Sequence, residues 1–263
     1  MTLRVFSHGG GAQSIAVLVL AAQGRLAYDV FLFCNVGDDS ENPLTIEYHH
    51  EVAVPFAERH GIRLVELRRV LRTGDTRTLL EEIDQFPRSI PIPVRLVGGG
   101  FGYRSCTKRF KIEVVARWTR QHGATPENPA TCGIGFSLDE VERATTLERV
   151  KHQRTEYPLL DLRLTRSDCR RIIADAGLPQ PPKSSCYFCP FQTLEDRRRQ
   201  RRESPALFAQ AVEVERTVNA HREALGLDKA WLSSLLAPLD ELPDWPGLFD
   251  EAETTCDVGS CFT

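Results

Sequence analysis

Short apolar runs alternate with longer stretches of helical period along most of the chain. Strands are expected at residues 3–6, 30–34, 63–67, 131–135 and 157–162. Helices are expected at residues 15–22, 44–59, 110–122, 138–150, 165–176 and 193–225. Strands that alternate with helices predict an α/β fold, a Rossmann-like parallel sheet with helices on both faces. Ligands bind such sheets beyond the carboxyl ends of the strands, and polar turns follow the first two runs.

Two segments depart from this alternation. Residues 87–105 hold three prolines and the run Gly98-Gly99-Gly100-Phe101-Gly102, a composition that fits either a substrate lid or a plain connector. Beyond residue 180 the pattern becomes largely helical around a pair of cysteines. We therefore expect a core at residues 1–180 and a cysteine-bearing helical extension, packed on the core, at residues 181–263.

Composition places the chain among ordinary globular proteins. It has 263 residues, 41% hydrophobic and 26% charged, with a formal net charge of −3, so there is no overall attraction to nucleic acid. No apolar run approaches the roughly 20 residues of a membrane span, and the first residues lack a signal-peptide pattern. We expect a cytoplasmic protein that does not bind membranes. Eight cysteines in such a protein are better explained by ligation or catalysis than by disulfides.

Two polar clusters are expected to be solvated. The arginine-rich run at residues 197–202 is flanked by acidic residues, and because arginine is used throughout the chain, a solvated helix with charge pairs is favoured over a phosphate-binding face. His49 and His50 lie side by side on a predicted helix with no third metal ligand near them in the sequence. Both histidines are therefore expected to face solvent.

The first predicted strand ends in a glycine-rich turn that leads into a helix. The turn reads Ser7-His8-Gly9-Gly10-Gly11-Ala12-Gln13-Ser14. Glycines let backbone N–H groups approach phosphate oxygens, the helix N-terminus adds partial positive charge, and a serine hydroxyl can donate. The turn is neither the GxxxxGK[ST] loop, because it has no lysine, nor the dinucleotide fingerprint. It predicts a phosphate site of another type, with His8 either a phosphate contact or a turn residue.

Three cysteines are the candidate metal ligands. Cys186 and Cys189 form a Cys-x-x-Cys pair, and Cys106 lies 80 residues before it. Such a pair directs two thiolates at one point, as an iron–sulfur cluster or zinc requires. The alternative is a structural zinc site on the two pairs Cys186/Cys189 and Cys256/Cys261. The remaining cysteines are expected in the core, Cys34 most clearly, and with it Cys132 and Cys169.

Four short segments together resemble the phosphoadenosine phosphosulfate (PAPS) reductase family, within the N-type ATP pyrophosphatases and adenine nucleotide alpha hydrolases. In chain order they are Gly9-Gly10-Gly11-Ala12-Gln13-Ser14, Asn35-Val36-Gly37 followed by Asp38 and Asp39, Gly133-Ile134-Gly135 followed by Glu140 and Arg143, and Pro158-Leu159-Leu160-Asp161-Leu162. The resemblance extends from about residue 3 to residue 190. The chain departs from the family pattern at Gly9, where the family has Ser, and at Asn35, where it has Asp.

The resemblance implies a site for an adenine nucleotide. The implied residues are Ser7, Gly9, Gly10, Gly11, Gln13, Ser14, Asn35, Gly37, Gly135, Glu140 and Arg143. Glu140 and Arg143 lie one turn apart on one helix face, so an ion pair is the alternative for them. The family also keeps basic residues at Lys108 and Lys111, which implies phosphate or sulfate binding there, with a surface helix start as the alternative.

The resemblance also extends to the cysteines. The cluster-bearing branch, which resembles adenylylsulfate reductases, binds a [4Fe–4S] cluster with Cys-Cys and, about 80 residues later, Cys-x-x-Cys. Here Ser105-Cys106 takes the place of the first pair, which leaves Cys106, Cys186 and Cys189. A fourth ligand would come from Cys256 or Cys261. Otherwise one iron stays open, as is associated with ATP-dependent tRNA thiolation enzymes.

Three activities follow from the resemblance. In the first, the enzyme binds ATP with Mg²⁺ at Asp38 or Asp39, adenylates an acceptor such as a nucleic acid, and transfers sulfur with the help of the cluster. In the second, Cys256 or Cys261 attacks a sulfonucleotide and a thiol reductant protein releases sulfite, although the family's C-terminal nucleophile segment is missing. The third is a nucleotide- or metal-binding regulator without turnover. The implied partners are an adenine nucleotide, a sulfur donor or thiol reductant protein, and a second copy in a homodimer.

Overall fold

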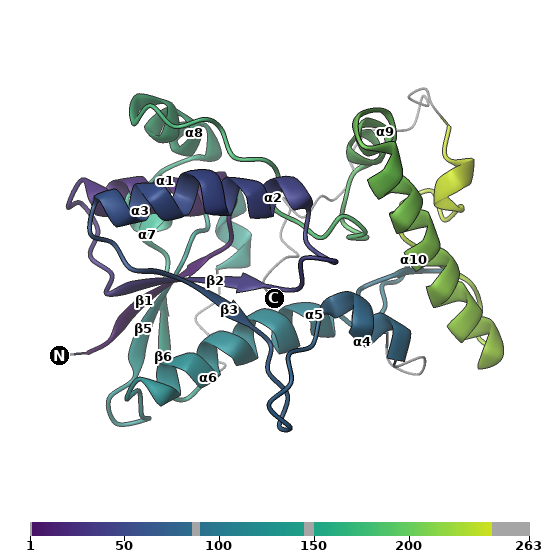
Figure 1. Cartoon of the computed structure of the whole chain (residues 1–263), viewed down its shortest axis with the longest axis horizontal. Helices are drawn as coiled ribbons and strands as arrows, with labels where there is room; N and C mark the ends of the chain where they lie inside the picture. Colours follow the sequence, from purple (N-terminus) through teal and green to yellow (C-terminus); the bar gives the residue numbers. More distant parts are fainter. Residues whose placement is uncertain (1, 86–89, 145–149, 244–263) are drawn as a thin grey trace. The chain divides into compact units, whose positions relative to one another are not determined.

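The computed structural model describes residues 2–85, 90–144 and 150–243. The chain divides into two compact units (Figure 1), each made from two separate stretches of sequence. The first, called the sheet unit below, is Met1–Thr76 with Arg109–Ser184. The second, called the cysteine unit, is Arg77–Lys108 with Ser185–Thr263.

The sheet unit is built on five parallel strands. They are β1 (Arg4–His8), β2 (Val30–Asn35), β3 (Leu64–Arg68), β5 (Ala130–Ile134) and β6 (Gln153–Glu156), in the order β3-β2-β1-β5-β6. In the register, Phe6 of β1 lies between Phe31 of β2 and Gly133 of β5. Every residue of β2 is buried, as expected for a parallel strand covered on both faces. The predicted α/β fold is confirmed.

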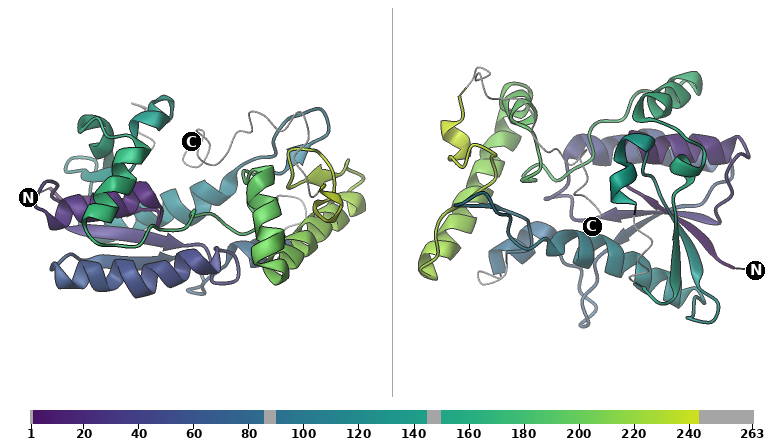
Figure 2. Two further views of the ribbon diagram at one scale, coloured as in Figure 1. Left: turned by 90° about the horizontal axis from the view of Figure 1, so that it is seen from above. Right: turned by 180° about the vertical axis from the view of Figure 1, so that it is seen from behind.

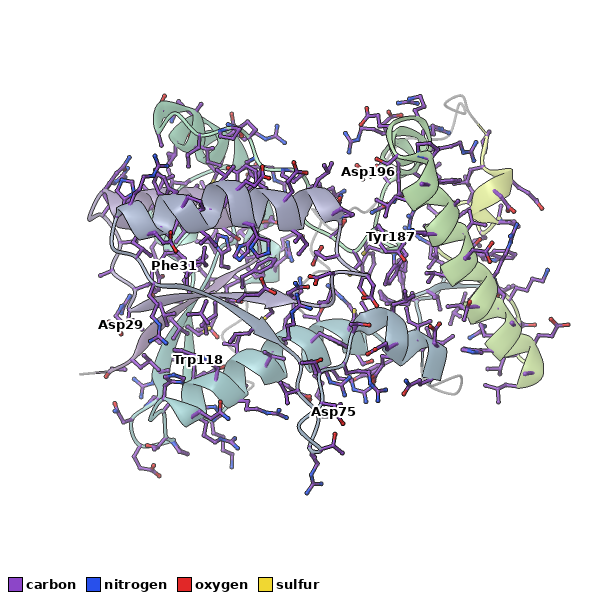
Figure 3. All side chains as sticks on the ribbon, viewed as in Figure 1. Asp29, Phe31, Asp75, Trp118, Tyr187 and Asp196 are labelled. Atoms are coloured by element: carbon purple, nitrogen blue, oxygen red, sulfur yellow. The ribbon has the colours of Figure 1, made fainter. Side chains whose placement is uncertain are left out.

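Helices cover both faces of this sheet (Figures 1 and 2). They are α1 (Ala12–Ala22), α2 (Pro43–Tyr48), η1 (His49–Ala53), α3 (Val54–Arg59), η2 (Lys108–Ile112), α6 (Glu113–Gln121), α7 (Pro158–Asp161) and α8 (Arg166–Asp175). One core joins Phe31 to the apolar face of α1 and to Ile173 of α8. The other joins Leu32 to Trp118 of α6, and Figure 3 labels Phe31 and Trp118, one from each core.

Two expected elements of the sheet unit are wrong. The expected strand at residues 157–162 is instead β6, which ends at Glu156, followed by α7 with Pro158 in its first turn. Proline suits that position because it has no N–H to offer a strand ladder. Of the helix expected at residues 138–150, the first part is a short 3₁₀ helix, η3 (Leu138–Arg143), with Glu140 outside helical backbone angles, and residues 145–149 lie outside the described residues.

The cysteine unit is mainly helical. Its elements are α4 (Leu79–Gln85), β4 (Arg95–Leu96), α5 (Ser105–Thr107), α9 (Leu194–Glu203), α10 (Pro205–Ala224), β7 (Ala230–Trp231) and η4 (Leu239–Glu241). The helix expected at residues 193–225 is broken at Ser204, because Pro205 cannot donate a helical hydrogen bond to a preceding carbonyl. Within the described ranges, no helix combines the length and apolar character needed to cross a membrane.

Residues 77–108 belong to a different unit from the one expected. The sequence assigned them to a core at residues 1–180, whereas they group with the C-terminal stretch. The physical reason is long-range pairing. β4 pairs antiparallel with β7, with Arg95 opposite Trp231, and the Arg95 Nε donates to the Pro190 carbonyl at 3.4 Å.

Candidate functional site

The glycine-rich turn connects β1 to α1 in a conformation that requires glycine. Gly10 has φ +76°, and a Cβ there would lie 3.1 Å from Thr45 Cγ2 and 3.3 Å from Phe33. The Gly9 N–H donates to Ser14 Oγ at 2.9 Å, which ties the start of the turn to the first turn of α1. The turn therefore has a fixed shape even without a ligand.

The N-terminus of α1 offers unpaired backbone donors. Its N-cap, Gly11, has no side chain to cap the helix, and the first turn holds no acidic residue. Ile15 is the first residue whose N–H bonds back into the turn, to the Gly11 carbonyl at 3.0 Å. The amides before it have no acceptor within the helix and carry partial positive charge. This is the geometry that binds phosphate groups.

Glu140 and Arg143 form a buried ion pair. Arg143 Nη1 donates to Glu140 Oε1, and both side chains are about 95% buried, with 4% and 5% exposed. Glu140 Oε2 accepts from Gln13 Nε2 at 2.9 Å, and Arg166 approaches at 3.5 Å. Of the two expectations for this pair, the ion pair is present. It holds Gln13 at the start of α1, beside Gly135, whose Cβ position is 3.5 Å from Gln13 Cβ.

Asn35 organises the turn after β2. Its Oδ1 accepts from the Gly37 N–H at 2.8 Å, and its Nδ2 donates to Asp38 at 2.8 Å and to Glu66 at 2.9 Å. Arg68 donates to both Asp38 oxygens, at 2.7 and 2.8 Å. These hydrogen bonds, that of Arg68 first, hold the pKa of Asp38 below its usual value. Asp38 is therefore ionised and already paired at neutral pH.

Asp39 is the second of the two predicted Mg²⁺ ligands in this turn. It is exposed, and its Oδ1 accepts from Ser40 Oγ at 2.8 Å. A magnesium ion at Asp38 would have to displace Arg68. The other predicted polar residues are placed separately: Ser7 is half-buried in β1, Lys108 is exposed at the end of the cysteine unit, and Lys111 is half-buried in the sheet unit.

In the cysteine unit, the loop that carries Cys186 and Cys189 is a tight turn fixed by hydrogen bonds. The Cys189 N–H donates to the Cys186 carbonyl at 3.0 Å. The Gln192 side chain donates to the same carbonyl at 3.1 Å. Both thiols are half-buried, and neither forms a disulfide with a described residue. Backbone bonding of this kind presents the two thiols from one short loop.

The side chain of Arg197, in α9, holds this loop in place through hydrogen bonds. Its guanidinium donates to the carbonyls of Tyr187 and Cys189, each at 2.8 Å; Figure 3 labels Tyr187. Arg197 is 1% exposed, and burial lowers its pKa to about 10, which leaves it charged at neutral pH. The expectation of a fully solvated arginine run is therefore wrong for Arg197 and Arg198, the latter 6% exposed. The expected charge pairs do occur further along, as between Arg199 and Asp196 at 2.7 Å.

Cys106 lies on a second segment that contacts the same loop. Its N–H donates to the Pro91 carbonyl at 2.7 Å, and the neighbouring Arg104 lies over the Phe191 ring at 5.1 Å. Burial raises the pKa of the Cys189 thiol; Cys106 raises it further, while Arg104 and Arg197 oppose the rise. The thiols of Cys106 and Cys189 therefore lie close enough for the charge of one to affect the other, although 83 positions separate them in the sequence.

The spacing of the three thiols differs from that of a single-ion site. Among the residues that the structure describes, the side chains whose ligand atoms all lie within 4.8 Å of one another are His49, His50 and Glu66, and the cysteines are not such a set. A tetrahedral zinc with Zn–S bonds of about 2.3 Å holds its sulfurs roughly 3.8 Å apart. Cluster ligands bind different irons and stand further apart. The three cysteines therefore do not form a closed single-ion site among the described residues, and the zinc alternative that also uses Cys256 and Cys261 lies outside them.

The other cysteines fall into two groups. Cys34, Cys132 and Cys169 are buried, and burial raises the pKa of each thiol to about 12, so the core expectation is confirmed. Cys256 and Cys261, predicted as fourth ligand or nucleophile, lie outside the described residues.

Sequence reasoning missed the environment of the histidines. His8 is 2% exposed, and neither ring nitrogen has a hydrogen-bond partner among the described residues. Burial lowers the pKa of His8 to about 3 and that of His49 to about 4. His49 was expected in solvent but is 2% exposed and stacks on Phe33 at 4.1 Å. Glu66, in strand β3, is the third polar residue near these histidines. It was missed because only the register of β3 with β2 places it beside Phe33, on which His49 stacks.

A basic groove in the sheet unit was also missed. It has a cavity volume of about 550 Å³ and is lined by the segment after β3 and by residues of η2 and α6. Its arginines are Arg68, Arg69, Arg72, Arg109 and Arg117. Glu113 is the acidic residue in the lining. Such a lining suits an anionic ligand, and the even spread of arginine through the sequence concealed it.

No protein-family model and no curated protein matches the chain. Among solved structures, it is similar to the U34-tRNA thiolase NcsA from Methanococcus maripaludis with its [4Fe-4S] cluster. The match has 15% sequence identity, covers 85% of this chain and 72% of that chain, and has a TM-score of 0.40. Similarity at this level carries no conclusion about activity, and the assignments rest on the residues described above.

Proposed function

We propose that the protein is an ATP pyrophosphatase of the PAPS reductase type that activates an acceptor by adenylation and transfers sulfur to it with the help of a [4Fe–4S] cluster. The observation that carries the proposal is the cysteine group. Cys106, Cys186 and Cys189 belong to one unit although they come from segments far apart in the sequence, and thiolates are the ligands that such a cluster takes.

The sheet unit supports the nucleotide half of the proposal. The amides at the start of α1 and the Gly9–Gly11 turn would bind the phosphates of ATP, and Ser14 would donate its hydroxyl to the leaving pyrophosphate. The Glu140–Arg143 pair orients Gln13 at this helix end. Asp38 or Asp39 would bind Mg²⁺, which offsets charge on the phosphates.

The proposed reaction has two steps. First, an acceptor oxygen attacks the α-phosphorus of ATP, the bond to the β-phosphate oxygen breaks, and pyrophosphate leaves. Second, a sulfur nucleophile attacks the activated carbon and AMP leaves with the original acceptor oxygen. Cys106, Cys186 and Cys189 would hold the cluster, which when bound would supply that sulfur. Arg197 would keep the Cys186–Cys189 loop in place through its two carbonyl contacts.

The basic groove supports a polyanionic acceptor such as RNA. Arginines bind phosphate oxygens in a bidentate manner, and five of them line this groove. A sulfonucleotide reductase remains the runner-up because Cys256 and Cys261, its candidate nucleophiles, lie outside the described residues.

The test uses full-length protein purified without oxygen and reconstituted with iron and sulfide. With Mg-ATP, a sulfide source and total tRNA, the proposal expects release of pyrophosphate and AMP and a thiolated nucleoside. Sulfite release from a sulfonucleotide with a dithiol, without pyrophosphate from ATP, would identify a reductase instead. If neither product forms and ATP still binds, the protein is a regulator.

A further inference from the structure

A second group of metal-ligand side chains lies in the sheet unit, apart from the cysteines. The side chains are His49 and His50 from η1 and Glu66 from β3. His50 Nε2 lies 3.6 Å and His49 Nε2 4.0 Å from Glu66 Oε2. One ligand atom from each lies within 4.8 Å of the other two.

The local fold explains how two adjacent histidines reach one carboxylate. Neighbours on an α-helix point about 100° apart, but His49 and His50 begin a π-helical turn between α2 and α3, an insertion that is frequent at functional sites. His49 stacks on Phe33, and Phe33 pairs in register with Glu66. The sheet register and the helical insertion thus bring the three groups together.

Glu66 is oriented by neighbours that bind its other oxygen. Oε1 accepts from Asn35 Nδ2 at 2.9 Å and from Arg68 Nε at 3.1 Å. These two donors turn Oε2 toward the histidines. Fixing the far side of a ligand in this way is the usual role of the groups around a metal site.

The separations are too long for hydrogen bonds between the imidazoles and the carboxylate. A divalent ion with bonds of about 2.0–2.2 Å spans ligand atoms roughly 3.3 Å apart, so small side-chain rotations would close the site. His50 has 55% of its side chain exposed, which leaves a solvent side for a water molecule or a ligand.

We propose that His49, His50 and Glu66 bind one divalent transition-metal ion of the zinc class, through two imidazole nitrogens and one carboxylate oxygen. Two nitrogen ligands distinguish this site from a Mg²⁺ site, which takes oxygen ligands. Three protein ligands and an open position are typical of a metal that acts on a bound molecule rather than of a structural zinc. The site uses none of the three cysteines, and its test does not depend on the proposed sulfur transfer.

Cobalt(II) is the probe, added to full-length protein whose cluster has been reconstituted so that its thiols are occupied. We expect one further equivalent to bind, with ligand-field bands and without the sulfur-to-cobalt charge-transfer band that thiolate ligands give. In isothermal titration with Zn²⁺, E66Q and H50A should each weaken this binding at least tenfold. His60, which is exposed and comes directly after α3, supplies the control. The variant H60A should bind Zn²⁺ like the wild type.

Three results would overturn the proposal: no additional binding by the wild type, a strong charge-transfer band, or unchanged affinity in both variants. His50 is largely exposed, so H50A should fold normally, and circular dichroism checks this. Because the readout is binding, loss of sulfur transfer in the activity assay would leave this result intact, and the converse also holds.

Discussion

At the scale of single residues, one buried guanidinium determines the shape of the cysteine loop. Arg197 is 1% exposed and donates to two carbonyls of the segment that carries Cys186 and Cys189. The sequence predicted the loop from its Cys-x-x-Cys spacing, but not the support beneath it. The sequence alone does not show whether an arginine is buried or solvated. For the arginines of α9, the tertiary contacts decide this.

The substitution R197M tests this support. Methionine fills a similar volume without donors, so the Cys189 carbonyl loses a charged partner, and we expect the free energy of unfolding to fall by about 2 kcal/mol. Iron content after reconstitution should fall with it. R199M is the control, because Arg199 forms an exposed pair and should cost less than about 1 kcal/mol. Equal iron content in both variants would show that Arg197 has no role in the proposed cluster site.

Gly10 is a second residue whose role can be isolated. The substitution G10A adds a Cβ at φ +76° and 3.1 Å from Thr45, so it should cost about 1–2 kcal/mol in stability and weaken ATP binding. G24A is matched to it, since Gly24 has φ +72° but nothing within 4 Å. We expect G24A to lose stability without losing nucleotide affinity. Thermal unfolding and ATP titration separate the two effects, and unchanged ATP affinity in G10A would contradict the assigned phosphate site.

His8 makes stability depend on pH. The unfolded chain protonates this histidine below about pH 6.5, whereas burial lowers the folded pKa to about 3. Between these values the unfolded state holds more protons, so the free energy of unfolding should rise with pH, by a few kcal/mol over the window. H8F, between Phe31 and Phe33, should flatten the slope. The measurement is urea unfolding from pH 4 to pH 7 with a chelator present. His49, with a pKa of about 4, supplies a residual slope, and identical slopes would refute the assignment.

At the scale of elements, most strands follow from their apolar runs, because a parallel strand buried on both faces has no polar alternation to obscure it. The errors arose where one residue decides between two elements. Pro158 begins a helix where a strand was expected, and Pro205 divides one expected helix into two. The histidine–glutamate group was missed because it depends on a π-helical insertion and on strand register, neither of which has a local pattern.

Helix capping gives a matched pair of element-scale variants. Thr193 and Thr165 each form a capping box, at the starts of α9 and α8. T193A and T165A should each lower stability by about 1 kcal/mol. Because α9 carries Arg197, we expect T193A to reduce iron retention during dilution, while T165A should not. If both variants lose iron equally, α9 has no special role at the cluster.

At the scale of the whole molecule, the two units are each assembled from separate stretches of chain. This arrangement could not be predicted from sequence, because the pairing of β4 with β7 joins segments more than 130 residues apart. The fold class was predictable because local alternation already encodes it. The unit to which residues 77–108 belong was not predictable, because proline- and glycine-rich segments have no hydrophobic period that identifies the element they pair with.

Iron removal should therefore act on both stretches of the cysteine unit together. After treatment with a chelator, hydrogen exchange should accelerate at residues 91–106 and 186–203, since Cys106, Cys186 and Cys189 would lose a shared ligand. The strands of the sheet unit should keep their protection. Acceleration confined to residues 186–203 would mean that Cys106 is not a ligand.

Because each unit is assembled from separate stretches of the chain, the order of these stretches limits how the cysteine unit could pass from one gene to another. The stretch Arg77–Lys108 lies between two halves of the sheet unit, and it supplies Cys106 and β4 to the other unit. A gene fragment that encodes only the C-terminal stretch would carry Cys186 and Cys189 without their third partner. A single recombination crossover before residue 77 transfers the three cysteines only together with strands β5 and β6 of the sheet. Transfer of the proposed cluster site to another protein would therefore require both stretches of the cysteine unit.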